Sequence, residues 1–345
     1  MAATPASELP SEREGVTRRT FMAALIGLCM LEIGLRILLG NFAQASLVQE
    51  ADDAAVCVEV QPDAELVYTG WLQRIARSDV RTNAQGARGP AIDQRPRPGV
   101  LRIAAVGDEF TFGMGVDGED AYVQVASRAL QREGIVNELL NFAVPGHATP
   151  QAVAQVLDKV VALRPDVVLL PVFADDMDPA ASWCAQPAPN AAATLLLRNL
   201  YTARLGWLLT RALRPPLLPA EAKDEEGAPA ARFARSIGQL QEAGRTHDFA
   251  VVVVLLTDRD AFSDPTYCDG CPAAHDLVEA LGVDVVDLSP VWRQLRADRD
   301  ASFLRGEGHL TIEGSLRVGL QLGQALAGWG ELQRRASDRS ARLRP

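Results

Sequence analysis

The chain has 345 residues, of which 48% are hydrophobic and 23% charged, so its composition is that of a folded globular protein rather than a disordered or fibrous one. Acidic residues outnumber basic ones by 44 to 34, which gives a formal net charge of −10. Proteins that bind the phosphate backbone need a basic surface, so this balance argues against nucleic acid as a partner.

An apolar segment lies near the start of the chain, over residues 21–39, and only Glu32 and Arg36 interrupt it. About twenty apolar residues are needed to cross the hydrocarbon core of a membrane, and two charges four residues apart pair on one face of a helix. Arg18 and Arg19 stand directly before the segment. The sequence therefore predicts a membrane anchor, with the rest of the chain on the periplasmic or extracytoplasmic side by the positive-inside rule.

A cleaved signal peptide is the alternative for the same segment. Residues 17–21 resemble a twin-arginine signal and residues 43–45 fit a small-residue cleavage site, so cleavage would give a secreted protein. Outside the segment, an even set of cysteines fits disulfide formation in an oxidising compartment. These are Cys57, Cys184, Cys268 and Cys271.

Regular structure is predicted to begin at residue 100. Short β-branched runs lie at 100–106, 138–144, 166–172, 249–257 and 283–288. Helical stretches lie between and after them at about 120–133, 150–163, 192–213, 231–245, 272–281 and 312–328. Strands that alternate with helices are typical of a parallel sheet buried on both faces. We therefore predict an α/β fold, a flavodoxin-like three-layer αβα sandwich with a five-stranded parallel sheet, preceded by one N-terminal hydrophobic helix.

The domain organisation follows from these elements. One α/β domain is expected over residues 100–330, with a mobile, Pro-rich and acidic insertion at 214–230. Turn-rich sequence before it indicates a linker or a partly structured entry segment, and the basic tail is expected to be a solvated helix end. The remaining divisions are a cytoplasmic n-region at 1–20, the anchor or signal segment at 21–43, the linker or entry segment at 44–99, and the tail at 331–345.

Polar and glycine-bearing motifs follow three of the predicted strands, and a fourth lies near the C-terminus. In open parallel sheets, ligands bind beyond the carboxyl ends of the strands, so these motifs mark the expected site. They are Gly107-Asp108-Glu109, the segment 141–146 that ends in Gly146, the segment 173–176 with Asp175, and the segment 305–314 with Glu307 and His309.

In this order and strand context, the four motifs resemble those of the SGNH, or GDSL-type, hydrolases, in particular a bacterial branch with an N-terminal membrane segment. The likeness extends over most of the chain and includes the block at 81–89. It implies an esterase or acyl-transfer role on glycan or lipid esters of the cell envelope. Members use a serine nucleophile in the first block, a glycine and an asparagine as oxyanion donors, and an Asp–His pair that activates the serine.

Carried over residue by residue, the resemblance assigns Gly146 to the oxyanion-hole glycine and His309 to the catalytic histidine. The other positions depart from the family. Glu109 occupies the nucleophile position, Asp175 stands where the asparagine donor belongs, and Glu307 is the nearest acid to the place of the aspartate. A carboxylate beside an imidazole holds a proton on it rather than being deprotonated by it. We therefore expect ordinary serine-esterase turnover to be absent.

Three interpretations of the altered site remain open. The cleft is retained for binding without turnover, or Glu109 and His309 support carboxylate-based acid/base hydrolysis. The third is a divalent metal ion held by carboxylate oxygens and one imidazole. Its ligands would be Asp108, Glu109, Asp175 and His309. The first interpretation needs no cofactor.

Overall fold

A computed structural model of the chain provides the structure. It describes residues 12–39, 47–68, 78–172, 196, 200–203, 205–206, 229–256, 278–295, 298–303 and 309–341. Residues 214–228 of the expected insertion lie outside the described residues. Its last two positions, 229 and 230, begin helix α9 (Pro229–His247).

The centre of the fold is a five-stranded parallel sheet, as the sequence predicts. The strand order is β6-β5-β7-β8-β9, so the first strand of the domain lies inside the sheet and the second at its edge. The three inner strands are almost fully buried, which matches the continuous apolar sequence of two of them, at 167–172 and 250–255, while the third carries one buried charge, Arg102. The strands are β5 (Leu101–Ala105), β6 (Asn137–Asn141), β7 (Val167–Val172), β8 (Ala250–Leu255) and β9 (Asp284–Asp287).

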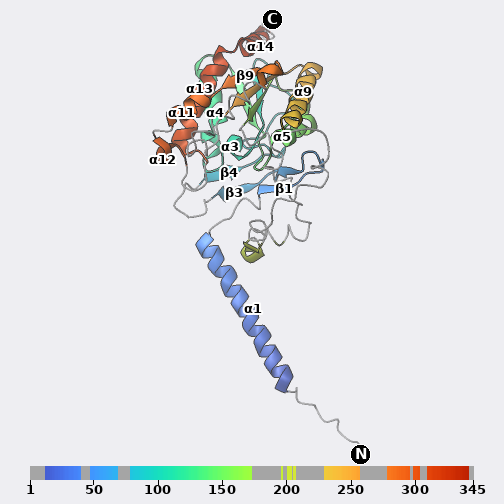
Figure 1. Cartoon of the computed structure of the whole chain (residues 1–345), viewed down its shortest axis with the longest axis vertical. Helices are drawn as coiled ribbons and strands as arrows, with labels where there is room; N and C mark the ends of the chain where they lie inside the picture. Colours follow the sequence, from blue (N-terminus) through green and yellow to red (C-terminus); the bar gives the residue numbers. More distant parts are fainter. Residues whose placement is uncertain are drawn as a thin grey trace, which may run out of the picture.

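Helices cover both faces of this sheet and complete the three layers (Figure 1). One face packs on α4 (Tyr122–Arg132), α11 (Ser289–Leu295) and α13 (Ile312–Gly328). The other face packs on α5 (Thr149–Gln155), its continuation in η2 (Val156–Val160) and η3 (Val161–Leu163), and α9. The predicted αβα sandwich is therefore confirmed. Shorter helical turns are α3 (Glu109–Phe112), η1 (Gly118–Asp120) and α12 (Arg299–Ser302).

Helices α4 and α13 approach each other closely because α13 carries glycine at the contact. A Cβ atom added at Gly319 would lie 2.4 Å from the Cβ of Val125 and 2.5 Å from the carbonyl oxygen of Tyr122. Gly323 meets Ala129 in the same way, at 2.5 Å. The spacing of these two glycines at i and i+4 places both on one face of α13, so the helix backbones touch along one seam.

The segment before residue 100, expected to be a linker or a partly structured entry segment, is structured where it is described. It forms two antiparallel pairs, and buried side chains from it pack on α3 and on the chain that follows β6. Isolated bridges pair Arg88 with Thr82 and with Asn141 of the edge strand β6. The strands are β1 (Val48–Glu50), β2 (Val58–Val60), β3 (Glu65–Tyr68) and β4 (Ser78–Arg81).

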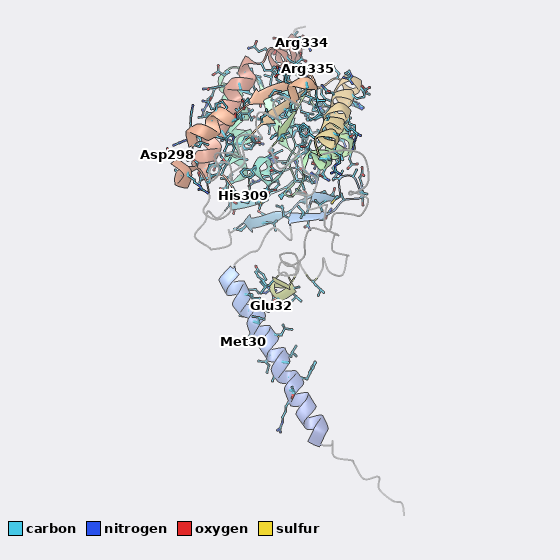
Figure 2. All side chains as sticks on the ribbon, in the orientation of Figure 1. Met30, Glu32, Asp298, His309, Arg334 and Arg335 are labelled. Carbon is cyan, nitrogen blue, oxygen red and sulfur yellow. The ribbon has the colours of Figure 1, made fainter. Side chains whose placement is uncertain are left out.

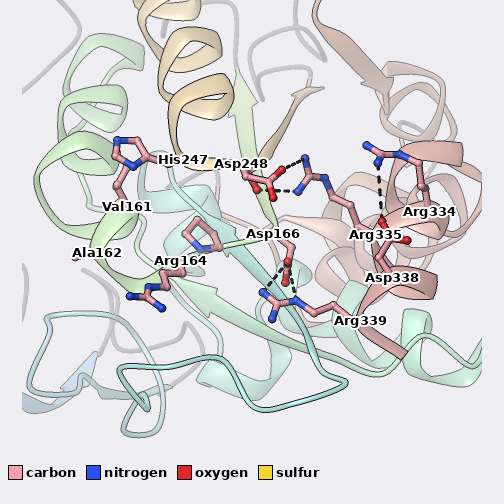
Figure 3. Close-up of a pocket in the computed structure, with 11 residues that line it drawn as sticks. Val161, Ala162, Arg164, Asp166, His247, Asp248, Arg334, Arg335, Asp338 and Arg339 are labelled. Atoms are coloured by element: carbon pink, nitrogen blue, oxygen red, sulfur yellow. Dashed lines mark hydrogen bonds and ion pairs between the residues drawn. The ribbon is translucent and has the colours of Figure 1, made fainter. Parts of the chain in front are cut away.

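The C-terminal tail is a helix with many exposed residues, as expected, and one side of it is attached to the domain. Residues 330–341 form α14 (Gly330–Ala341), whose Leu332 is fully buried. Arg339 pairs with Asp166 at 2.8 Å, and Arg335 pairs with Asp248 at 3.3 Å (Figure 3). A cavity of about 610 Å³ lies between these pairs, at the amino-terminal edge of the sheet. These ion pairs attach the tail to the domain. The number of arginines in the tail does not indicate which acidic residues they pair with.

At the other end of the molecule, α1 (Glu12–Leu39) extends away from the side that carries β1, β3 and β4 (Figure 1). Within the described residues, no helix combines the length and the apolar character that spanning a membrane requires. Many large apolar side chains of α1 are 44–66% exposed. They are Phe21, Met22, Leu25, Ile26, Leu28, Met30, Leu31 and Ile33.

Candidate active site

The motif after β5 forms a tight turn that starts α3. Asp108 is the N-cap of this helix, and its Oδ1 accepts hydrogen bonds from the backbone N–H groups of Phe110 at 3.0 Å and Thr111 at 3.3 Å. An aspartate cap satisfies N–H groups that have no partner within a helix. Asp108 is therefore a structural residue of the turn. The sequence signal was present, because Asp before a short helical run is a typical cap.

Glu109 lies at the carboxyl end of the sheet and contacts the motif that follows β6. Its Oε2 accepts a hydrogen bond from the backbone N–H of Gly146 at 3.0 Å. Gly146 has φ of 84°, a left-handed conformation that favours glycine and helps to aim this N–H at the turn. The structure therefore brings together the two residues that the resemblance assigns to the nucleophile position and the oxyanion hole.

Asn141, the last residue of β6, fixes the relative position of these two motifs. Its Nδ2 donates to the carbonyl oxygen of Thr111 at 2.8 Å, and its Oδ1 accepts from the N–H of Ala143 at 3.1 Å. Both motifs also follow parallel strands that are direct neighbours in the sheet. The geometry between Glu109 and Gly146 is thus held by the main sheet and by a buried amide.

His309 lies beside the same turn and is 8% exposed. Its ring meets the ring of Phe110 edge to face, with 5.8 Å between the ring centroids. Phe110 also contacts Trp292 of α11, with 6.4 Å between centroids. The aromatic residue next to Glu109 therefore places the histidine at this site. In the sequence, only the position of Phe110 directly after Glu109 indicates this role.

His147, directly after Gly146, is buried rather than solvated, at 4% exposed. Its Nε2 lies 2.7 Å from the carbonyl oxygen of Val58 in β2. Burial lowers the pKa of His147 to about 4, against a smaller raising effect of hydrogen bonding to the backbone of Val58 and Val56. The ring is therefore neutral at pH 7, and it joins the Gly146 loop to the entry segment.

Arg88 supports the far end of α3 from the entry segment. Its guanidinium donates to the carbonyl oxygens of Phe112 at 2.7 Å, Gly113 at 2.6 Å and Val116 at 2.6 Å. The side chain is almost fully buried and lies over the Phe112 ring. Burial lowers its pKa to about 10, so it stays charged at neutral pH. Arg88 lies in the block at 81–89 that contributes to the resemblance, but no local sequence pattern indicates this role.

Two of the expected site residues, Asp175 and Glu307, lie outside the described part of the chain. The proposed metal ligands Asp108, Glu109 and His309 are described. Among the described residues, no group of three or more His, Cys, Asp or Glu side chains is arranged to hold a metal ion. Of these three, Asp108 caps α3 and Glu109 accepts from Gly146; because the fourth expected ligand, Asp175, lies outside the described residues, the metal site stays a prediction.

Solved structures with a similar fold include a protein described as lipolytic and of the G-D-S-L family from Desulfitobacterium hafniense DCB-2, at 14% identity and a TM-score of 0.43. The match covers 65% of this chain and 99% of that one. A lipase/acylhydrolase from Enterococcus faecalis matches at 15% identity and a TM-score of 0.42, over 66% and 96% of the two chains. The esterase EstA from Pseudoalteromonas sp. matches at 11% identity and 0.44, over 66% and 97%. No family model and no curated protein matches the sequence.

Proposed function

We propose that the protein is an SGNH (GDSL-type) hydrolase-like protein that has lost serine-esterase turnover and keeps its cleft for binding an ester of a cell-envelope glycan or lipid. The hydrogen bond from Gly146 N–H to the Glu109 carboxylate carries this proposal. In the family, that N–H stabilises the oxyanion of a reacting ester. Here a negatively charged oxygen of the protein already accepts it, in the region where the oxyanion would form.

The chemical consequence is twofold. Position 109 supplies no hydroxyl to be acylated, and a substrate carbonyl would have to displace a charged acceptor from the donor that it needs. Hydrogen bonds to charged groups are stronger than those to neutral ones, so a neutral ester carbonyl competes poorly for Gly146. Removal of one oxyanion donor alone raises a reaction barrier by about 2.7–4 kcal/mol.

Hydrolysis of p-nitrophenyl acetate by the full-length protein tests the proposal. We expect wild type, Glu109→Ala and His309→Ala to give the same background rate. Glu109→Ser frees the Gly146 N–H and restores a hydroxyl near His309, so it alone should gain turnover, which a second substitution, His309→Ala, should abolish. If Glu109→Ser shows no gain either alone or combined with Asp175→Asn, which restores the missing amide donor, Gly146 and His309 do not form the family's site.

The same assay separates the active alternatives. Wild-type turnover that is lost in both Glu109→Ala and His309→Ala would establish the carboxylate/His mechanism and refute the non-catalytic proposal. Turnover that survives Glu109→Ala and is lost only in His309→Ala would refute the assignment of Glu109 to the nucleophile position. Turnover that appears only on addition of a divalent ion would favour a metal site completed by residues such as Asp175.

We propose further that α1 attaches the domain to a membrane, with the domain on the extracytoplasmic side. The exposed apolar side chains of α1 support attachment. Cys57 is disulfide-bonded, and disulfides persist in oxidising compartments outside the cytoplasm. The other cysteines of the expected set lie outside the described residues. Fractionation of cells with alkaline carbonate tests the attachment, and recovery of the intact protein in the soluble fraction would contradict it.

A further inference from the structure

The charged pair Glu32 and Arg36 interrupts the apolar sequence of α1, and the structure shows what surrounds it. Arg36 Nε lies 3.0 Å from Glu32 Oε1, which confirms the expected pairing on one helix face. The Glu32 side chain is only 14% exposed, whereas the large apolar side chains around it, such as Leu31 and Ile33, are about half exposed. Another part of the chain therefore covers Glu32 specifically.

The covering segment is the chain around Tyr201, which lies about 170 residues further along the sequence. Glu32 Oε1 accepts from Tyr201 N–H at 2.8 Å, and Oε2 accepts from Thr202 N–H at 2.9 Å and from Thr202 Oγ1 at 3.0 Å. The Arg36 guanidinium lies over the Tyr201 ring, 5.4 Å from its centroid. Tyr201 is 8% exposed. One carboxylate thus gathers donors from two distant stretches of the chain (Figure 2 labels Glu32 in the half of α1 nearest the domain).

This arrangement satisfies both sides of the contact. The carboxylate has donors for both oxygens, and two backbone N–H groups have a charged acceptor. In water, either side could bond to solvent, so the contact would be of little importance. In apolar surroundings, an unsatisfied N–H group or an unpaired carboxylate costs several kcal/mol, and mutual pairing becomes a requirement. The network is therefore suited to a place from which water is excluded.

Two described residues near Tyr201 are exposed leucines. Leu196 is 52% exposed and Leu200 is 37% exposed, and the N–H of Leu200 donates to the carbonyl oxygen of Leu196 at 2.8 Å. These two leucines and the apolar residues of α1 are thus exposed, while Glu32 and the N–H groups of Tyr201 and Thr202 are paired with one another.

We propose that Glu32 docks the chain around Tyr201 onto α1, and that the docked segment and α1 form one apolar surface whose partner is a phospholipid bilayer. The bilayer part rests on the membrane attachment proposed above, whereas the docking does not. The docked segment follows β7, whose carboxyl end lies at the same edge of the sheet as Glu109. Docking therefore connects the N-terminal helix to the chain that leaves the edge of the candidate active site.

Hydrogen exchange of the full-length protein in phosphatidylethanolamine/phosphatidylglycerol vesicles tests the docking. In Glu32→Ala, the Tyr201 and Thr202 amides should exchange at least about tenfold faster than in wild type. Glu32→Gln keeps an acceptor oxygen and should fall between the two. The matched control Glu119→Ala removes an exposed carboxylate from η1 and should change nothing at these amides. Equal exchange in wild type and Glu32→Ala would overturn the docking.

Co-sedimentation with the same vesicles tests the bilayer part. Leu200→Ser should bind several-fold more weakly than wild type. Leu316→Ser should bind like wild type, since Leu316 is a leucine of somewhat greater exposure that lies on α13, away from α1. Equal binding of the two variants would overturn the role of the docked segment. Failure of the wild type to bind would refute the attachment and the bilayer partner, while hydrogen exchange would still decide the docking.

Discussion

His147 should make the stability of the protein depend on pH between 7 and 5. The folded state keeps the buried ring neutral, with its pKa lowered from 6.5 to about 4. The unfolded chain takes up a proton as the pH falls through about 6.5. The unfolded state then binds more protons than the folded state, so the free energy of unfolding falls with pH until the folded ring also protonates near pH 4.

The size of the effect follows from the shift. Each pKa unit corresponds to about 1.4 kcal/mol, so the full shift is worth about 3 kcal/mol of unfolding free energy. Of this, about 2 kcal/mol should be lost between pH 7 and pH 5, because the unfolded chain is almost fully protonated at pH 5 and the folded ring is not. For a domain with an unfolding free energy of about 5–15 kcal/mol, that loss is readily measured.

Urea unfolding of wild type and His147→Gln at both pH values measures it. Glutamine keeps an N–H donor for the carbonyl oxygen of Val58 and does not titrate, so the variant should lose about 2 kcal/mol less than wild type on acidification. His247→Gln is the control, because His247 is exposed at the end of α9 and should behave like wild type. Equal losses in wild type and His147→Gln would refute a buried neutral ring.

Two further predictions concern the packing around the site and between helices. Arg88→Ala leaves three carbonyl oxygens without their charged donor, so the free energy of unfolding should fall by about 3 kcal/mol or more, with little recovery in Arg88→Lys because lysine lacks the planar fork. Urea unfolding checks this, and a change below about 1 kcal/mol would contradict it. Gly319→Ala should lower the free energy of unfolding by about 1–3 kcal/mol, because the added methyl group forces α13 away from α4. Gly238→Ala on α9 should raise it by about 0.5–1 kcal/mol, because a Cβ atom there meets no other atom within 4 Å. Thermal unfolding of the pair would show opposite shifts, and shifts of the same sign would count against the close contact.

The sheet and the meeting of Glu109 with Gly146 are predictable from sequence for a physical reason. The runs that form β7 and β8 are too apolar to lie anywhere except in a buried sheet, and the predicted strands, β5 and β6 among them, alternate with helices. Parallel strands end at one edge, so residues directly after them converge there. The position of the strands does not predict the hydrogen bond from the Gly146 N–H to the Glu109 carboxylate, because that bond depends on the side-chain rotamer of Glu109.

Other features depend on partners that are remote in the sequence. His147 is buried by the carbonyl oxygen of Val58, 89 residues away, and no local pattern marks a histidine for a backbone acceptor. Helix α14 is attached through Arg339 to Asp166, 173 residues away. The pairing of Glu32 with Arg36 is predictable because the two residues have helical spacing. The hydrogen bond from the Tyr201 amide to Glu32 has no such signal in the sequence. The contacts of His147 and Glu32 are to backbone groups that every residue carries, and that of Arg339 is to one carboxylate among many, so composition cannot single them out.

The bridge between Arg88 and Asn141 has a consequence for where the folding unit begins. Strand β6 is an edge strand, and the chain around Arg88 pairs with its end, with the N–H of Arg88 donating to the carbonyl oxygen of Asn141 at 2.8 Å. A chain cut at residue 100 would keep every strand of the main sheet and still lose this cover. It would expose an open strand edge next to the apolar surface left by the missing hairpins, which is the form of a β protein most prone to intermolecular pairing.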